Sequence, residues 1–246
     1  MNRLNKKLGE NDPDTVVAMN SLAAAYNRQG KYIDAENLLK ERLDQMIKLF
    51  GYCHPPTLHT MSVLSTSYAS QGDYRRAEVL QNICLAKRKI VLGEDDPDTL
   101  GTMHSLADTY SKQEKNREAE VLYKQCLIKK KVVLGENHPD TLRTMCSLAN
   151  AYSSQRKYKE AELLHKQCLD KQKVVLGESH PDTLNAMNNL AATYDYQDKY
   201  REAEALYKQC LDKRKVVLGE NHPSTLVTMN NLAIVRQLLN AKHHDF

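Results

Sequence analysis

The sequence has no tryptophan, two phenylalanines, nine glycines and seven prolines in 246 residues. So little glycine and proline excludes a collagen-like or low-complexity chain. The longest uninterrupted apolar run, residues 22–26, is far shorter than the roughly 20 residues that cross a bilayer. The first ten residues carry Lys and Arg but no apolar stretch, so we expect no secretory signal.

A large excess of charge of one sign is also lacking. The chain carries 35 Lys and Arg against 31 Asp and Glu, a net charge of +4, and the two signs are interleaved. Nucleic-acid-binding proteins usually gather basic residues into a patch or stripe. The charge pattern therefore does not indicate a nucleic-acid-binding protein, and the 41% of hydrophobic residues is ordinary for a globular chain.

What the sequence does contain is one unit that repeats every 42 residues without insertion or deletion. Residues 139–180 and 181–222 are identical at 28 of 42 positions. Self-similarity at a fixed period is the signature of a repeat protein rather than of a series of unlike domains. A proline stands at the same place in every unit: Pro13, Pro55, Pro97, Pro139, Pro181 and Pro223.

Each unit is predicted to form two helices. Proline suits the first turn of the first helix, where its missing N–H needs no partner. The second helix begins near Tyr32 and its equivalents and runs about 18 residues to a Leu-Gly pair, whose glycine is placed to close it with a left-handed cap. The apolar residues after Pro97 follow the three- and four-residue spacing of one helix face: Leu100, Met103, Leu106, Ala107 and Tyr110.

We expect these helices to form a single repeat domain over residues 1–246. Residues 1–12 resemble the end of a truncated helix, and residues 223–246 are predicted to form a closing first helix and a tail. The result is an all-α fold with eleven full helices. Five helix-pair repeats lie between the two ends, at residues 13–54, 55–96, 97–138, 139–180 and 181–222.

The residues within each unit resemble a known family. Met187-x-x-Leu190-Ala191-x-x-Tyr194, followed by Ala203-x-x-x-Tyr207, resembles the tetratricopeptide signature. The 42-residue period and the Leu-Gly-Glu-x-His-Pro-Asp-Thr-Leu link are similar to those of kinesin light chains and nephrocystin-3-like scaffold proteins. The resemblance implies a tetratricopeptide-type α-solenoid, a right-handed superhelix of antiparallel helix pairs whose first helices line a concave groove.

The six cysteines are predicted to be free thiols. Equivalent positions in successive repeats are separated by at least the roughly 8–10 Å between packed helices, whereas a disulfide needs Cα atoms closer than about 7 Å. Cys53 falls in a loop and Cys146 on a first helix, each alone. Free thiols indicate a reducing compartment, so we expect a cytoplasmic protein. The other four cysteines share one repeat position: Cys84, Cys126, Cys168 and Cys210.

No motif of an enzyme or of a metal site is present. The sequence has no Cys-x-x-Cys pair, no His-x-x-x-His pair, no glycine-rich phosphate loop and no nucleophile motif. We therefore expect no catalytic residue, no metal and no cofactor. The histidines of the links recur once per repeat and cannot converge on one ion: His54, His138, His180 and His222.

Differences between the units concentrate on one face of the first helix, where three rows of positions change from unit to unit. The first row is Asn20, Ser62, His104, Cys146, Asn188 and Asn230. The second row is Ala24, Thr66, Asp108, Asn150, Ala192 and Ile234. The third row is Arg28, Ser70, Lys112, Ser154, Tyr196 and Leu238. Second-helix positions such as Glu162 and Glu204 stay the same, so the variation favours a face tailored to a ligand.

We predict that this face binds a peptide. An Asn side chain can donate to and accept from a peptide backbone at once. The resemblance implies a role for matching Asn residues, which in kinesin light chains contribute to binding short aromatic–acidic cargo segments. The predicted peptide-binding residues are Asn20, Arg28, Ser62, His104, Asp108, Lys112, Arg143, Cys146, Asn150, Asn185, Asn188, Tyr196 and Asn230.

Three functions fit the sequence. The leading one is a noncatalytic scaffold that holds a peptide or a partner segment in the concave groove. The second is a structural or self-associating segment of a larger signalling or scaffold protein. The third is binding of nucleic acid or acidic lipid by the Lys-rich ends of the second helices, such as residues 129–131. Basic residues at that end also complement the helix dipole, so the third is the least favoured.

Overall fold

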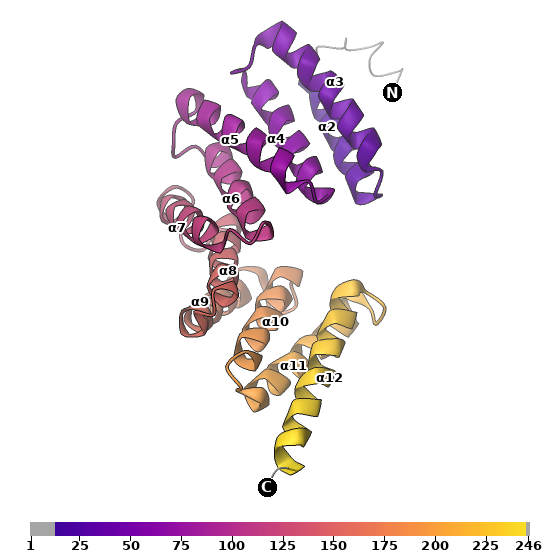
Figure 1. The fold of residues 1–246 in the computed structure, drawn as a ribbon, viewed down its shortest axis with the longest axis vertical. Coiled ribbons are helices and arrows are strands. Elements are labelled where there is room, and N and C mark those ends of the chain that lie inside the picture. The colour runs from indigo at the N-terminus through magenta and orange to yellow at the C-terminus, as the bar shows by residue number, and fades with distance from the viewer. Residues whose placement is uncertain (1–12, 245–246) are drawn as a thin grey trace. The chain divides into compact units, whose positions relative to one another are not determined.

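The computed structural model describes residues 13–244, which form eleven helices and no strand (Figure 1). The first helices of the repeats are α2 (Pro13–Arg28), α4 (Pro55–Ser70), α6 (Pro97–Lys112), α8 (Pro139–Ser154), α10 (Pro181–Asp195) and α12 (Pro223–His244). The second helices are α3 (Tyr32–Phe50), α5 (Tyr74–Val91), α7 (Asn116–Val133), α9 (Tyr158–Leu176) and α11 (Tyr200–Leu218). The predicted all-α fold is confirmed, and the helix end expected in residues 1–12 lies outside the described residues.

The chain divides into two compact units, one ending at Lys129 and one beginning at Lys130. The N-terminal unit contains α2 to α6 and most of α7, and the C-terminal unit contains the end of α7 and α8 to α12. Within each unit every first helix packs against the second helix that follows it. First helices of neighbouring repeats also contact each other, as α2 contacts α4 in one unit and α8 contacts α10 in the other.

The residues of the links begin the first helices. Proline occupies the first turn, and in α6, α8, α10 and α12 the side chain of the residue before it caps the helix, whereas His54 before α4 makes no such bond. Asp96 accepts hydrogen bonds from the backbone N–H groups of Asp98 and Thr99. In other repeats the Nδ1 atom of His138 or His180 accepts from the N–H two residues later, at 3.1 and 3.2 Å. These histidines therefore act as N-caps, a role that satisfies otherwise unpaired N–H groups.

The two turns of each repeat differ in backbone conformation. The turn after the first helix uses a left-handed residue, with φ of 61° at Glu114 and 60° at Arg156. The glycine after the second helix is different: Gly177 has φ of 90° and ψ of 159°. That conformation lies outside the left-handed helical region and is open essentially to glycine alone. The predicted glycine stop is present, but it is not the left-handed cap that the sequence suggested.

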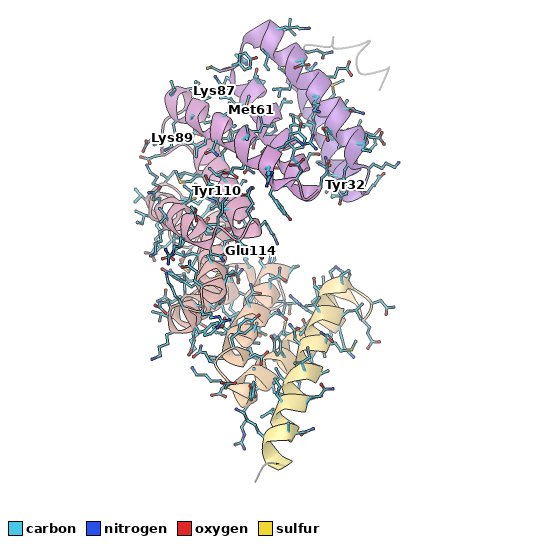
Figure 2. The ribbon with its side chains drawn as sticks, viewed as in Figure 1. Tyr32, Met61, Lys87, Lys89, Tyr110 and Glu114 are labelled. Carbon is cyan, nitrogen blue, oxygen red and sulfur yellow. A yellow bond between two sulfur atoms is a disulfide. The ribbon has the colours of Figure 1, made fainter. Side chains whose placement is uncertain are left out.

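The core of each unit is built from the predicted apolar stripes. Met61 lies among the helices of the N-terminal unit (Figure 2) and is 2% exposed. It belongs to a cluster with Leu58, Leu64 and Tyr68 of α4 and Cys84 of α5. A matching cluster in the C-terminal unit contains Leu184, Met187 and Leu190. Burial of these side chains, each contributing about 1.5–3 kcal/mol, holds the helix pairs together.

A buried cationic side chain near the end of a second helix donates hydrogen bonds to the first helix of the next repeat. Arg88 Nη1 donates to the carbonyl oxygen of Asp98 at 2.7 Å and to Thr102 Oγ1 at 2.8 Å. Arg214 makes the same pair of contacts with Ser224 and Thr228, and Lys130 makes it with Asp140 and Thr144. We call this arrangement the cation latch. Charge-assisted hydrogen bonds of this kind offset part of the desolvation of the cation.

The acidic residue that recurs on the second helix joins neighbouring repeats. Glu36 pairs with Arg76 at 2.7 Å and Glu78 pairs with Lys115 at 2.8 Å. Burial raises the pKa of Glu162, but hydrogen bonds from Lys166, Lys199 and Gln197 outweigh that effect and lower it to about 2. The contacts explain why this position is the same in every repeat.

Candidate partner-binding surface

The three variable rows differ in how open they are. We call the surface that they form the first-helix face. The first row lies closest to the junctions between first helices, and Asn20 and His104 are each only 4% exposed. The third row is open, with Arg28, Lys112 and Tyr196 all exposed. A partner on this face therefore meets the second and third rows before the first.

A groove of about 250 Å³ lies between α4, α5 and α6 on the first-helix face of the N-terminal unit. Two residues predicted from the sequence, Asp108 and Lys112, lie in its wall. The complete lining is Thr66, Ala69 and Ser70 of α4, Tyr74 and Gln81 of α5, and Ser105, Asp108, Thr109 and Lys112 of α6. The groove is small, and its exposed lining is more apolar than polar with a few polar groups, so it fits a short stretch of peptide better than a large ligand.

The hydroxyl groups in the groove wall are turned toward their own helices. Ser70 Oγ donates to the carbonyl oxygen of Thr66 at 2.9 Å, and Thr109 Oγ1 donates to that of Ser105 at 3.0 Å. Ser105 donates to Gly101 in the same way. Because each hydroxyl proton is already used, what these groups can offer a ligand is oxygen lone pairs. The wall therefore presents mainly hydrogen-bond acceptors.

Gln81 lines the groove from the second helix. Its side chain is 2% exposed, and its Oε1 atom has no hydrogen-bond partner within the described part of the chain. Equivalent positions elsewhere hold Leu39, Tyr123, His165 and Tyr207. Gln81 was not among the predicted binding residues, because those were drawn only from the first helices. The signal was a polar residue in a second-helix stripe that is otherwise mostly apolar or aromatic.

Asp108 is held in position by two side chains. The Tyr123 hydroxyl donates to its Oδ1 atom, and His104 Nε2 lies 3.3 Å from its Oδ2 atom. The Asp108 side chain is nevertheless 49% exposed. A carboxylate has about four lone-pair sites, so Asp108 keeps acceptor capacity toward the groove. The structure thus brings together three side chains from positions that differ between repeats: His104 and Asp108 on α6 and Tyr123 on α7.

Lys112 is the cationic member of the groove. Its side chain is exposed, one turn beyond Asp108 on α6, and none of the described residues forms an ion pair or hydrogen bond with its ammonium group. An exposed lysine contributes a mobile positive charge that is strongly screened by salt. The groove therefore combines acceptors in its wall and buried side with one donor at its rim.

The predicted residues of the C-terminal unit fall into two groups. Asn185 and Asn188 make internal contacts, because Asn185 Oδ1 accepts from Arg214 at 2.6 Å and Asn188 Oδ1 accepts from Thr228 at 3.0 Å. Asn150 and Asn230 are exposed. Tyr196 is 60% exposed, and its ring stacks on that of Tyr158 with 5.5 Å between centroids. Asn185 is exposed as well but is held by Arg214, so Asn150, Tyr196 and Asn230 are the exposed members that these internal hydrogen bonds do not engage.

The remaining predicted residues are spread over both units. Asn20 Nδ2 donates to Thr60 at 3.5 Å, which places this buried amide at the junction of α2 and α4. Ser62 is half-buried on α4, and Arg28 is exposed in the last turn of α2. Arg143 of α8 is exposed and pairs with Asp140 at 2.8 Å. None of these four lines the groove of the N-terminal unit.

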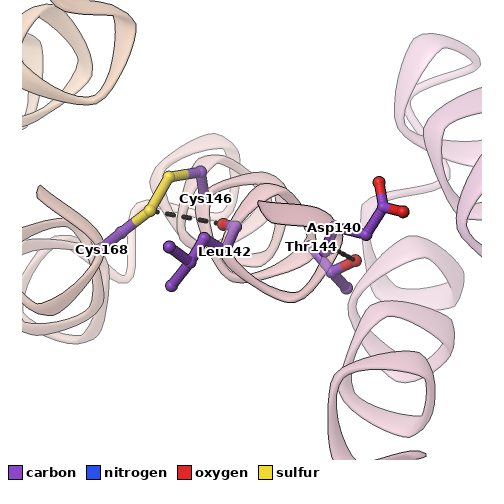
Figure 3. The surroundings of a disulfide bond; sticks show 5 residues. All are labelled: Asp140, Leu142, Thr144, Cys146 and Cys168. Carbon is purple, nitrogen blue, oxygen red and sulfur yellow. Dashed lines mark hydrogen bonds between the residues drawn. A yellow bond between two sulfur atoms is a disulfide. The ribbon is translucent and has the colours of Figure 1, made fainter. Parts of the chain in front are cut away.

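The expectation of six free thiols is wrong. Cys146 of α8 and Cys168 of α9 form a disulfide, with 6.1 Å between their Cα atoms (Figure 3). The sequence argument compared equivalent positions, 42 residues apart. The bonded pair joins two different positions, 22 residues apart, on the two helices of one repeat. Cys146 is therefore not alone, and its thiol is not available to a peptide in this state. Four cysteines are free: Cys53, Cys84, Cys126 and Cys210.

The Lys-rich helix ends are engaged with the acidic links. Lys129 contacts Asp95 at 2.6 Å and Glu94 at 3.1 Å. Lys171 pairs with Glu136 at 3.0 Å, and Lys213 pairs with Glu178 at 2.6 Å. Each basic stretch thus has a local acidic partner, which weakens its attraction for a phosphate.

Two other kinds of site were sought in the described residues. No group of three or more His, Cys, Asp or Glu side chains within residues 13–244 is arranged to hold a metal ion. None of the helices in the same range has the length and apolar character needed to span a bilayer.

Family models match most of the chain. A model described as tetratricopeptide repeat matches residues 99–140, 141–182 and 183–224, and a second model with the same description matches residues 14–89. No curated protein sequence matches at a significant level.

Solved structures share the fold. A single-substitution variant of a putative kinesin light chain from Podospora anserina, with nearly identical tetratricopeptide-like repeats, has a TM-score of 0.72 and 26% identity, covering 82% of this chain and 96% of that one. The same protein without the substitution gives 0.71 and 25%, covering 85% and 99%. BtubC from P. vanneervenii gives 0.71 and 21%, covering 86% and 84%, which is a likeness of fold alone.

Proposed function

The chain belongs to the tetratricopeptide repeat family, and from this premise we propose that it is a noncatalytic scaffold that binds an extended segment of a partner protein on its first-helix face. In the N-terminal unit the groove is the proposed contact site. The exposed Asn150, Tyr196 and Asn230 are proposed as the contact residues of the C-terminal unit. Its likeness to a putative kinesin light chain supports a role in holding a partner.

The observation that carries the proposal is the unpartnered Oε1 atom of Gln81 in the groove. A buried acceptor without a hydrogen bond is unfavourable by about 1–3 kcal/mol. An N–H group from a ligand would remove that penalty. The hydroxyl oxygens of Ser70 and Ser105 add further acceptors in the wall. An extended peptide supplies backbone N–H donors at regular intervals, so its chemistry matches these groups.

One observation bears on the alternatives. Ion pairs between the Lys-rich helix ends and the links disfavour binding of nucleic acid or acidic lipid through those lysines. Self-association remains a distinct proposal, which predicts a mass that rises with concentration in light scattering. We place the protein in the cytoplasm, as the four free cysteines favour a reducing compartment.

Capture of a partner from a lysate, followed by measurement of its affinity, tests the proposal. Gln81→Leu places in the groove the residue that Leu39 provides in the first repeat, so folding is expected to be retained. Lys112→Ser copies Ser70 and Ser154. Together these changes are expected to weaken binding by about 1–3 kcal/mol, or roughly 5- to 150-fold, because they remove an acceptor and a charge from the contact.

The matched control is Asp212→Asn, an exposed position on α11. It is expected to leave affinity nearly unchanged, because an isolated surface charge contributes little at physiological salt. If Asp212→Asn abolishes binding while the groove pair has no effect, the partner sits on the second helices and the proposed site is wrong.

A further inference from the structure

The disulfide joins a half-buried residue to a fully buried one. Cys146 belongs to the first row of the first-helix face and is half-buried, whereas Cys168 is 0% exposed. Figure 3 shows the two side chains meeting between α8 and α9, with Cys168 beside the backbone of Leu142. The side of the disulfide that faces solvent is therefore the Cys146 side, and a thiol from solvent approaches the bond there.

The other repeats show how Cys168 fits when it carries a proton. The equivalent thiols of Cys84, Cys126 and Cys210 donate to the carbonyl oxygens of Leu58, Leu100 and Leu184 at 3.4, 3.3 and 3.2 Å. The Cys168 sulfur already lies 3.4 Å from the carbonyl oxygen of Leu142. A reduced Cys168 thus has its hydrogen-bond acceptor in place.

The helix pair also does not require a disulfide at the repeat position of Cys146. Ser62, His104 and Asn188 occupy that position in neighbouring repeats, and none of them can form a covalent link to the second helix. The helix pair is therefore compatible with both states of the sulfur pair. The fold therefore does not depend on the Cys146–Cys168 disulfide.

We propose that Cys146–Cys168 is a reversible thiol–disulfide exchange site, at which a small thiol or dithiol attacks the sulfur of Cys146. The thiolate forms a bond to Cys146 Sγ while the bond to Cys168 breaks, and the electron pair leaves on Cys168 Sγ, which takes a proton from water. A second thiolate then attacks the reagent's sulfur in the mixed disulfide and releases Cys146. In total one protein disulfide is reduced by two electrons and two protons as two reagent thiols become a disulfide.

Once the mixed disulfide on Cys146 has formed, the burial of the released Cys168 sulfur slows its attack back on that bond. Burial raises the pKa of the Cys84 and Cys210 thiols, which occupy the same repeat position as Cys168. A reduced Cys168 in such a place stays protonated and attacks poorly, because the thiolate is the nucleophile. The same burial makes Cys168 a slow leaving group, so exchange is expected over minutes to hours.

The consequence for partner binding rests on the proposed function. In the oxidised state Cys146 is tied to α9 and also packs against the cluster of α10 that contains Leu184 and Met187. In the exchanged state the first-helix face of the C-terminal unit carries either a free thiol or a bulky adduct. The site therefore gives this face two chemical states that a cellular thiol can interchange.

The test uses the folded full chain carrying Cys53→Ser, which removes the exposed free thiol. The protein is incubated with reduced glutathione, quenched with acid and digested for mass spectrometry. One adduct is expected, on Cys146, exceeding any on Cys168 by tenfold or more. Native reduction with dithiothreitol followed by N-ethylmaleimide should label Cys146, and Cys168 only after denaturation. Equal labelling of both sulfurs, or six thiols in untreated wild-type protein, overturns the proposal.

Variants separate exchange from loss of structure. Cys146→Ser, which copies Ser62, is expected to form no adduct and to melt roughly 5–10 °C below the oxidised protein, with no dependence on reductant. Cys126→Ala is the matched control and should keep the full redox dependence. A Cys146→Ser midpoint equal to that of the oxidised protein contradicts the proposal. These readouts need no partner, so they can fail while the groove variants still lose binding, and the reverse outcome is equally distinguishable.

Discussion

Three residues other than glycine hold left-handed turns between the helices of a repeat. Glu114, Arg156 and Asp198 have φ of 61°, 60° and 59°, and the first two repeats use Gly30 and Gly72 in the same place. The side chain of an L-residue makes this conformation unfavourable by roughly 1 kcal/mol relative to glycine. The last three complete repeats therefore carry local strain that the first two avoid.

Arg156→Gly is expected to stabilise the protein by up to roughly 1 kcal/mol. The gain comes from relief of the left-handed backbone, and the greater freedom of glycine in the unfolded chain offsets part of it. Thermal unfolding monitored by circular dichroism measures the effect. Ser154→Gly, in the last turn of α8, is the control and should destabilise instead. A lower midpoint for Arg156→Gly would mean that the turn carries no strain.

His165 is a buried histidine without a hydrogen bond. Its side chain is 0% exposed, and neither ring nitrogen has a partner in the described structure. Burial disfavours the charged ring and lowers the pKa of His165 from its ordinary value of 6.5 to about 4. Tyr123 and Tyr207 stand at the equivalent positions. The neutral ring therefore acts as packing in this repeat.

The depressed pKa of His165 predicts a loss of stability in mild acid. In the unfolded chain the ring takes up a proton below pH 6.5, whereas in the fold it does so only below about pH 4. The contribution of the neutral His165 ring to the free energy of unfolding is therefore fully present at pH 7. It decreases by about 3 kcal/mol as the pH falls from 6.5 to 4. Urea unfolding at several pH values measures it.

His165→Tyr is the matched variant, because tyrosine has no proton to gain in that range. Its stability should stay level between pH 6.5 and 5, where the wild-type protein weakens. Parallel decline of the two proteins would show that other groups cause the acid sensitivity.

At the scale of the helix, the cation latch is present at three repeat junctions and absent from two, since the apolar Met46 occupies the latch position between α3 and α4. Arg88, Lys130 and Arg214 each reach a carbonyl oxygen and a threonine of the following first helix. At the junction of α9 and α10 the latch residue is Gln172, and Ala186 replaces the threonine. Gln172 is 4% exposed, and its Oε1 has no partner among the described residues. That junction lacks the latch.

Restoring the latch is expected to stabilise the C-terminal unit. Gln172→Arg with Ala186→Thr recreates the pair that Arg214 and Thr228 form, and should add roughly 1–2 kcal/mol through charge-assisted hydrogen bonds, after desolvation of the cation. Chemical denaturation of the double variant and of each single variant measures the gain. Gln172→Arg alone keeps only the carbonyl acceptor and should gain less. A double variant no more stable than the wild type would contradict the latch.

How far the sequence predicted the elements depends on what repeats. The 42-residue period and the prolines predicted the first helices, because one local pattern is copied six times. The disulfide was not predicted, because Cys146 and Cys168 occupy different repeat positions. The distance between the two residues depends on how α8 and α9 pack. The glycine stop after α9 was placed correctly, but ψ at Gly177 depends on the path of the link, which the sequence does not specify.

At the scale of the whole molecule, the constant positions join the repeats, and the variable positions carry the proposed recognition surface. The recurring Glu of the second helix joins repeats, as Glu78 does with Lys115. The variable first-helix rows carry the groove residues Asp108 and Lys112. This part of the candidate site was predictable because it lies where the repeats differ. Gln81 and the internal contacts of Asn185 and Asn188 were not, since they depend on which neighbours each side chain meets.

The most direct test of the account is site-specific photocrosslinking within the N-terminal unit. A photoreactive amino acid is placed at Ser70, in the groove wall, or at Val79, which is 61% exposed on the second helix α5. Both proteins are mixed with the captured partner and irradiated. A crosslinked product is expected at Ser70 and little or none at Val79. Efficient crosslinking at Val79 with none at Ser70 would contradict the claim that the first-helix face is the binding surface.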